Sequence, residues 1–199
     1  MEIEKRMPED KPADNEEEGK QEPEEKRNWR REAVMFIREF AMALIISLLL
    51  TRYVFIIPLV PTGSMIPTIN IDERILVDKI TRFFSPLKHG DIVVFPCPDS
   101  PEELYVKRIV AMAGDTLEIY GGEVYLNGVP LDEPFIAAPT EGIYGPYLVP
   151  EGHIFVMGDN RNHSRDSRKW VTTNYVEVSA VQGRGVVVLW PLNAMRRLR

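Results

Sequence analysis

Residues 40–60, FAMALIISLLLTRYVFIIPLV, form the one segment of this chain that is apolar enough to cross a membrane, and Arg52 is their only charge. About 20 apolar residues span the hydrocarbon core of a bilayer, so this stretch predicts a membrane-spanning helix. A charge near the middle opposes insertion by about 2.5–3.5 kcal/mol. The opposition falls if the helix starts near Ala33 and Arg52 extends to the far interface, with Pro58 at the exit. A buried core helix is the alternative interpretation.

Basic residues crowd the N-terminal flank of this stretch, at positions 26, 27, 30, 31 and 38, and none occurs on the other side from Tyr53 to Glu73. Lys and Arg, rather than net charge, set the orientation of a membrane helix. We therefore expect a cytoplasmic N-terminus in the cell membrane, with residues 61–199 outside. A cleaved export signal is disfavoured because the apolar stretch is long and begins late.

The sequence before the apolar stretch is acidic and almost free of apolar residues. Residues 1–28 hold eleven acidic and six basic side chains, in a chain whose net charge is -6. Such a segment cannot bury enough surface to offset the entropy lost on ordering. We expect a disordered acidic tail over residues 1–32, an anchor over residues 33–60 and a single domain over residues 61–199. The nearly neutral remainder argues against a nucleic-acid partner.

Short apolar runs separated by turn residues follow Pro67, and no long helical periodicity occurs there. Asn127-Gly128 after one such run is a strong signal for a type I′ hairpin. The pattern predicts a mostly β domain, an antiparallel sandwich or barrel, with irregular connections at residues 96–103 and 130–150. Its core must form without disulfides, because Cys97 is the only cysteine. The expected strands cover residues 74–80, 91–95, 104–113, 115–120, 123–126, 153–157 and 185–190.

Ser64 lies directly after the apolar stretch, within VPTGSMIPTI at residues 60–69. Gly63 allows close backbone approach, and Pro61 and Pro67 restrict φ on either side. A small hydroxyl on such a rigid turn is well presented for nucleophilic attack. A serine nucleophile also needs a base to accept its proton.

Lys107 is one candidate for that base. In Tyr105-Val106-Lys107-Arg108-Ile109-Val110-Ala111 the strand alternation places Lys107 on the same face as Tyr105, Ile109 and Ala111. Burial among apolar neighbours lowers the pKa of a lysine, which can then act as a general base near neutral pH. The alternative is that Lys107 and Arg108 both extend to solvent from the sheet edges.

A histidine is the other candidate base. His89, His153 and His163 all lie in turns or at strand ends, where surface positions are common. A triad of Ser64, His163 and either Asp159 or Asp166 remains open at this stage.

A dense polar run, MGDNRNHSRDSR at residues 157–168, follows one of the expected strands. Asp159, Arg161, Asp166 and Arg168 can form ion pairs with one another, and Ser164 is a spare hydroxyl. A solvated turn is the alternative interpretation. The chain contains no recognisable metal or phosphate motif, so we expect neither metal nor cofactor.

Four blocks occur together in an order typical of one enzyme family: residues 61–68 (PTGSMIPT), 74–79 (RILVDK), 90–95 (GDIVVF) running on to 105–110 (YVKRIV), and 158–161 (GDNR) with the residues that follow. From the membrane segment to about Pro191 the chain resembles bacterial type I signal peptidases. These are membrane-anchored Ser/Lys endopeptidases that remove signal peptides from exported preproteins after small residues at positions -1 and -3. The resemblance implies a mostly β fold that touches the bilayer. The secretion translocon is a further candidate partner.

The same resemblance implies a role for each matched residue. Ser64 is the expected nucleophile and Lys107 the general base. Ser164 would orient the lysine amine, and Thr62, where many relatives have Ser, would assist the Ser64 backbone N–H in the oxyanion hole. The remaining matches are Met65, which would shape the substrate pocket, and Asp166 with Arg168, which would form a supporting ion pair.

Two other readings compete with this one. A self-cleaving repressor of the LexA type has a similar Ser/Lys core but needs a helix-turn-helix domain, which the sequence does not suggest. A non-catalytic membrane-anchored β domain would use the same residues structurally. The effect of Ser64→Ala on function separates an enzyme from a scaffold.

Overall fold

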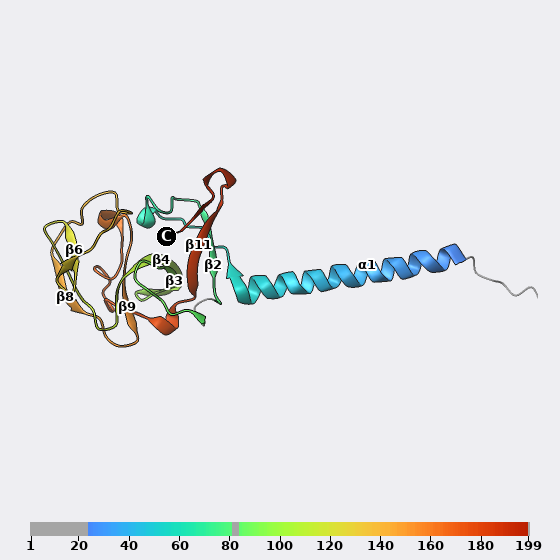
Figure 1. The fold of residues 1–199 in the computed structure, drawn as a ribbon, viewed down its shortest axis with the longest axis horizontal. Helices are drawn as coiled ribbons and strands as arrows, with labels where there is room; N and C mark the ends of the chain where they lie inside the picture. Colours follow the sequence, from blue (N-terminus) through green and yellow to red (C-terminus); the bar gives the residue numbers. More distant parts are fainter. Residues whose placement is uncertain (1–23, 81–83, 199) are drawn as a thin grey trace, which may run out of the picture. The chain divides into compact units, whose positions relative to one another are not determined.

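The computed structural model describes residues 24–80 and 84–198 (Figure 1), and the chain divides into two units between Ile45 and Ile46. An α-helix, α1 (Glu24–Leu49), continues into a π-helical turn, η1 (Leu50–Val54). The helical segment Asn28–Val54, of 27 residues, is long and apolar enough to cross a membrane. The described part of the second unit consists mainly of β-strands.

The predicted anchor boundaries need correction at both ends. Helix α1 begins at Glu24, so residues 24–32 are helical rather than part of a disordered tail. Glu, Lys and Arg are good helix formers, and here they extend an apolar helix that is already formed. Residues 1–23 of the expected tail lie outside the described residues. At the other end, Phe55–Ile56 form strand β1, so Arg52 lies near the end of the helix rather than in its middle.

Strand β1 explains why the apolar sequence continues beyond the helix. Phe55 pairs with Asp78 and Ile56 with Val77 of β2 (Arg74–Asp78), and Val60 is buried in the core of the β unit. Ile56 and Val60 therefore pack in this unit, whereas Ile57 and Leu59 are exposed.

The larger sheet of the β unit is antiparallel, with the strand order β1-β2-β11-β3-β4-β9-β10 and with β12 paired to β11. Strand β4 lies between β3 and β9, near the centre of the sheet (Figure 1). The strands not yet bounded are β3 (Ile92–Cys97), β4 (Ser100–Met112), β9 (His153–Met157), β10 (Val176–Glu177), β11 (Gly183–Trp190) and β12 (Arg196–Arg197).

A second antiparallel sheet has the order β7-β6-β5-β8. Figure 1 shows β6 and β8 on one side of β9, and β2 and β11 on the other. Asn127 and Gly128 join β6 to β7 with φ angles of 54° and 79°, which confirms the predicted type I′ hairpin. The mostly β prediction is also confirmed. The strands are β5 (Thr116–Tyr120), β6 (Glu123–Leu126), β7 (Val129–Pro130) and β8 (Tyr144–Leu148).

Two connections predicted to be irregular contain strand. In residues 96–103 the β3–β4 hairpin leaves only a short turn, and residues 130–150 contain β8. Pro96, Gly145 and Pro146 make these segments look like loops in the sequence. All three lie at the margins of the sheets, where a missing N–H or a flexible residue disrupts little of the ladder.

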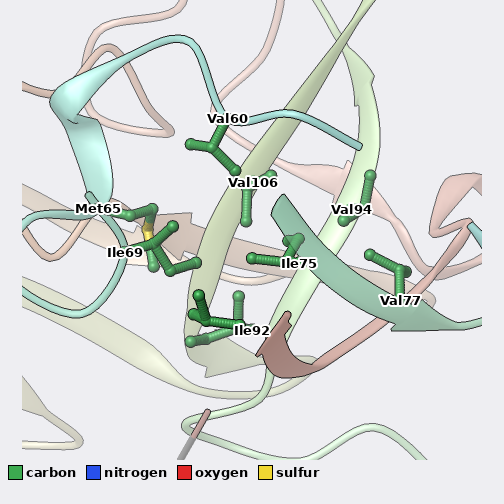
Figure 2. Packing of buried hydrophobic residues seen from close by; sticks show 9 residues of the cluster. Val60, Met65, Ile69, Ile75, Val77, Ile92, Val94 and Val106 are labelled. Carbon is green, nitrogen blue, oxygen red and sulfur yellow. The ribbon is translucent and has the colours of Figure 1, made fainter. Parts of the chain in front are cut away.

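A cluster of buried apolar residues packs beneath the segment that carries Ser64 (Figure 2). Met65 and Ile69 come from this segment and contact side chains of β2, β3 and β4. Both are fully buried, and burying a side chain of this size stabilises the fold by about 1.5–3 kcal/mol. Met65, the residue after Ser64, therefore anchors the turn to the hydrophobic core. The short 3-10 helices are η2 (Gly63–Met65), η3 (Arg161–His163), η4 (Val178–Ala180) and η5 (Leu192–Ala194).

Candidate active site

Ser64 lies in η2, the single 3-10 turn that the flanking prolines and the buried Met65 hold in place. The Ile69 N–H donates to the Met65 carbonyl oxygen at 2.9 Å, which closes the turn on its C-terminal side. Ser64 itself is only 8% exposed. The turn therefore presents one hydroxyl in a nearly dry environment.

Lys107 reaches this hydroxyl from β4. Its amine donates to Ser64 Oγ at 2.8 Å and to the Val106 carbonyl oxygen at 3.0 Å. The Tyr105 ring lies on the same side, with its centroid 5.0 Å from the amine. Lys107 is 3% exposed, so the contact with Ser64 forms inside the protein.

Burial lowers the pKa of the Lys107 amine from 10.5 to about 8. The negative charges of Asp166 and Asp159 act in the opposite direction, but they do not outweigh the loss of hydration. At pH 7 a group with this pKa is neutral in roughly a tenth of the molecules. Lys107 can therefore accept a proton near neutral pH, which an ordinary surface lysine does to a negligible extent.

The two adjacent cations of β4 are both buried, so the reading in which they extend to solvent is wrong. Arg108 donates to Asp159 at 2.8 Å and 2.7 Å, and to the Gly90 carbonyl oxygen at 2.8 Å. The predicted alternation holds as far as Ile109. A β-bulge between Ile109 and Ala111 then moves Ala111 away from the face of Lys107, into the cluster that contains Val110.

The polar loop after β9 supports the pair from the other side. Gly158 lies so close to the Ser64 carbonyl oxygen and the Ser164 side chain that a Cβ atom would collide with both. Ser164 is 2% exposed, and the hydrogen bonds of the Lys107 amine go to Ser64 and to the Val106 carbonyl oxygen instead. The expected bond from Ser164 to Lys107 is therefore not formed in this structure.

The predicted ion pair between Asp166 and Arg168 is present. The guanidinium donates to both carboxylate oxygens at 2.8 Å, and the Gly158 N–H donates to one of them at 3.0 Å. Burial raises the pKa of the Asp166 carboxyl, but the hydrogen bonds and charge of Arg168 outweigh it, and the pKa falls below its usual range. The carboxylate thus stays ionised and holds the loop.

The other charges of this loop have partners that sequence reasoning missed. Asp159 pairs with Arg108 and accepts a 2.5 Å hydrogen bond from Thr68, and Arg161 pairs with Glu133 at 2.6 Å. The adjacency of Lys107 and Arg108 on one strand was a signal that the second cation needed a buried carboxylate. No comparable signal in the sequence points to Glu133.

None of the three histidines forms a hydrogen bond with Ser64 in the described part of the chain, although His163 lines the same cavity. His89 contacts Asp115, and His153 contacts the Glu151 carbonyl oxygen. The His163 ring lies against Asn160, and among the described residues no hydrogen bond links it to Ser64, Asp159 or Asp166. The structure therefore brings lysine, and not histidine, to the hydroxyl.

A cavity of about 590 Å³ opens onto the pair. Its walls are formed by the segment before Ser64, by the first half of β4 and by the loop after β9, in which His163 and Arg165 lie. Thr62 lines this cavity, and its hydroxyl is 3.4 Å from Ser64 Oγ. Met65 faces the core instead. In the described part of the chain no group of three or more His, Cys, Asp or Glu residues could hold a metal ion.

A serine hydroxyl in contact with a basic side chain beside a cavity is the kind of arrangement that serine hydrolases use, and the β domain has one at Ser64 and Lys107. Comparison with known proteins gives the family. The family model described as signal peptidase, peptidase S26, matches residues 33–190, and the chain belongs to this family. It is a serine endopeptidase.

Individual relatives agree with the family match. A signal peptidase I of Leptolyngbya laminosa is 35% identical over 81% of this chain and 82% of its own length. One from Bacillus licheniformis is 32% identical over 87% of this chain and 97% of its own length. A crystal structure of a signal peptidase I from Enterococcus faecalis V583 is 29% identical, covers 50% of this chain and 97% of that chain, and has a TM-score of 0.45.

Proposed function

We propose that this protein is a membrane-anchored signal peptidase that cleaves signal peptides from exported preproteins, with Ser64 as nucleophile and Lys107 as general base. The observation that carries the proposal is the 2.8 Å contact between the buried Lys107 amine and Ser64 Oγ. Buried lysine has few structural uses without a carboxylate partner, whereas a lysine with a lowered pKa is an effective base.

The reaction has two halves. In the first, neutral Lys107 accepts the Ser64 proton while Oγ attacks the scissile carbonyl carbon, and the protonated amine then donates to the departing amine as the C–N bond breaks. The signal peptide is left as an ester on Ser64. In the second half, Lys107 takes a proton from water, the hydroxide attacks the ester, and Ser64 recovers its proton from the amine.

The supporting residues act on this pair. The backbone N–H of Ser64 and the Thr62 hydroxyl are suited to bind the oxyanion that forms at each attack. Ser164, which lies across Gly158 from the Ser64 carbonyl oxygen, would orient the Lys107 amine during the reaction. Met65 anchors the turn from the core and thereby helps to hold Ser64 beside the substrate site.

The cavity is suited to an extended peptide. The first half of β4 pairs with β3 on one side only, and the segment around Leu59–Thr62 lines the opposite wall. A substrate strand can add to this free edge and place alternate side chains in the walls. We expect acceptance of small residues at -1 and -3, and replacement of Ala by Phe at -1 should abolish cleavage, because overpacking a shaped site is unfavourable. Equal cleavage of the peptides with Ala and with Phe at -1 would show that the site does not select small residues.

The anchor supports a place of action at the membrane surface. The excess of Lys and Arg before the apolar stretch of residues 40–60 favours a cytoplasmic N-terminus and an external domain. Protease added outside intact cells should then digest the β domain and spare the tail. Digestion of the tail alone would show that the orientation is the opposite one, with the N-terminus outside.

The function is tested with the full chain in detergent. Purified protein is incubated with a preprotein, and the new N-terminus of the product is sequenced. Wild type should release the mature protein, and Ser64→Ala should release none while unfolding at the same temperature. Cleavage by the Ser64→Ala variant would make the protein an enzyme of another kind, and absence of cleavage by wild type would leave it as a scaffold.

A further inference from the structure

Asn160 holds both peptide groups that flank the Ser64 Cα atom. Its side-chain amide donates to the Gly63 carbonyl oxygen at 2.9 Å, and its backbone N–H donates to the Ser64 carbonyl oxygen at 3.0 Å. The first of these contacts spans 97 residues of sequence. Asn160 therefore links the loop after β9 to the turn that carries Ser64 (the nucleophile turn) through two hydrogen bonds.

The side chain of Asn160 is used in an unusual way. Asn160 is the N-cap of η3, a position where asparagine ordinarily accepts a hydrogen bond from the helix backbone. Here its side chain makes no such capping bond. Its amide nitrogen points to Gly63 instead, and its oxygen faces His163 Nδ1 at 3.3 Å.

The bond to Gly63 acts on a group that the reaction needs. The Gly63 carbonyl and the Ser64 N–H belong to one planar peptide, so fixing the oxygen also fixes the direction of the N–H. A donor on the carbonyl polarises the peptide and makes its N–H a stronger donor. Within the turn, Gly63 O otherwise accepts from the Ile66 N–H at the longer distance of 3.3 Å.

We propose that Asn160 is a positioning residue that aims and polarises the Ser64 N–H toward the oxyanion, through its hydrogen bond to the Gly63 carbonyl. This inference rests on the proposed function. Because the oxyanion forms only after attack, loss of the Asn160 amide should slow turnover and leave substrate binding almost unchanged.

The experiment compares Asn160→Ala with Asn162→Ala in the full chain. Asn162 lies on the same loop and also donates to a carbonyl oxygen, that of Pro139 at 3.1 Å, but it does not touch the nucleophile turn. Asn160→Ala should lower kcat for preprotein cleavage roughly ten- to hundredfold, less than direct removal of an oxyanion donor, with KM within about twofold. Asn162→Ala should leave both close to wild type. The rising limb of the pH profile of Asn160→Ala should keep its apparent pKa, since Lys107 is not altered.

Rates are expressed per active site from the acyl-enzyme burst, so that partly unfolded protein does not count. Asn160→Asp keeps the size of the side chain without the amide donor and should also lose kcat, which covers failure of the alanine variant to fold. Equal losses in the two alanine variants, a loss confined to KM, or wild-type kcat in Asn160→Asp would overturn the inference. Ser64→Ala is run alongside. Cleavage without Ser64 refutes the proposed function, whereas Ser64-dependent cleavage with normal kcat in Asn160→Ala refutes only the positioning role.

Discussion

The two faces of strand β4 carry adjacent buried cations with opposite surroundings. Arg108 is locked by a bidentate pair with Asp159, both side chains being 2% exposed or less. Lys107, 3% exposed, donates to Ser64 Oγ and to the Val106 carbonyl oxygen, and among the described residues it forms no ion pair with a carboxylate. One face thus compensates its buried charge fully, and the other does not.

The difference separates a structural cation from a reactive one. A carboxylate within hydrogen-bonding distance would favour the charged form of Lys107 and keep it from accepting a proton. Arginine cannot lose its proton in a protein, so the charge at Arg108 must be paired. The burial that destabilises the charged form of Lys107 is therefore what equips it to act as a base.

The largest effect should come from exchanging the chemistry on the reactive face. Lys107→Arg keeps the positive charge but cannot accept the Ser64 proton, so kcat/KM should fall roughly 10⁴–10⁶-fold, as expected for loss of one member of a catalytic unit. Preprotein cleavage measured from pH 5 to 11 checks this. Wild-type activity should rise with pH along a limb set by the pKa of about 8, because the neutral amine is the active form. An active arginine variant, or a wild-type pH profile that is flat, would show that Lys107 is not the base, and the distinction between a reactive and a structural cation on β4 would be wrong.

The alternation of apolar and charged residues was enough to predict β4 from Leu104 onward and the candidacy of Lys107, but it left the burial of the two cations open. The turn around Ser64 could be predicted because Pro61 and Pro67 restrict φ and Gly63 allows close backbone approach. Strand β8 could not be predicted, because its Gly145-Pro146 pair is tolerated only through its place at a sheet edge. The partners of Asp159 and Arg161 also escaped prediction, since side chains 51 and 28 residues apart meet only in the folded chain.

The resemblance to signal peptidases supplied more of the site than the strand pattern did. Residue spacing alone left His163 and Lys107 both open as bases. Asn160, by contrast, lies in the GDNR motif at residues 158–161, but the sequence suggested no role for it. Its role depends on a contact that forms only when the Ser64 turn packs closely against the loop after β9.

Exchanging the paired cation should affect stability rather than chemistry. Arg108→Met leaves Asp159 buried with Thr68 as a remaining donor, and an uncompensated buried charge costs about 3–5 kcal/mol of the free energy of unfolding. Denaturant unfolding of the full chain in detergent measures this. Adding Asp159→Leu should recover most of the loss, because an apolar pair needs no compensation. A variant Arg108→Met as stable as wild type would show that the pair is not the structural element that its geometry suggests.

A matched change at Lys107 should have the opposite sign. The pKa of Lys107 is near 8 in the folded protein and near 10.5 in the unfolded chain, so the unfolded state binds more protons between these values. Stability contributed by this group is therefore lowest below pH 8 and rises as pH increases to 10.5, by about 3 kcal/mol. Lys107→Met should lack this rise and should be at least as stable as wild type at pH 7. Parallel pH profiles of unfolding for the two proteins would contradict the lowered pKa.

The smallest effect should follow from weakening an ion pair while keeping its geometry, at Glu133. Its carboxylate receives two 2.6 Å hydrogen bonds from Arg161, whose side chain is 1% exposed. Glu133→Gln removes the charge but leaves one amide oxygen as an acceptor, so the free energy of unfolding should fall by about 1–3 kcal/mol, less than for Arg108→Met. Since neither Glu133 nor Arg161 forms a hydrogen bond or ion pair with Ser64 or Lys107 in the described part of the chain, kcat at a temperature where the variant is folded should stay near wild type. The pH limb of activity should not move either. If Glu133→Gln instead shifted that limb, the paired charges would be tuning the Lys107 amine through the loop, and the two faces of β4 would have to be treated as one electrostatic unit.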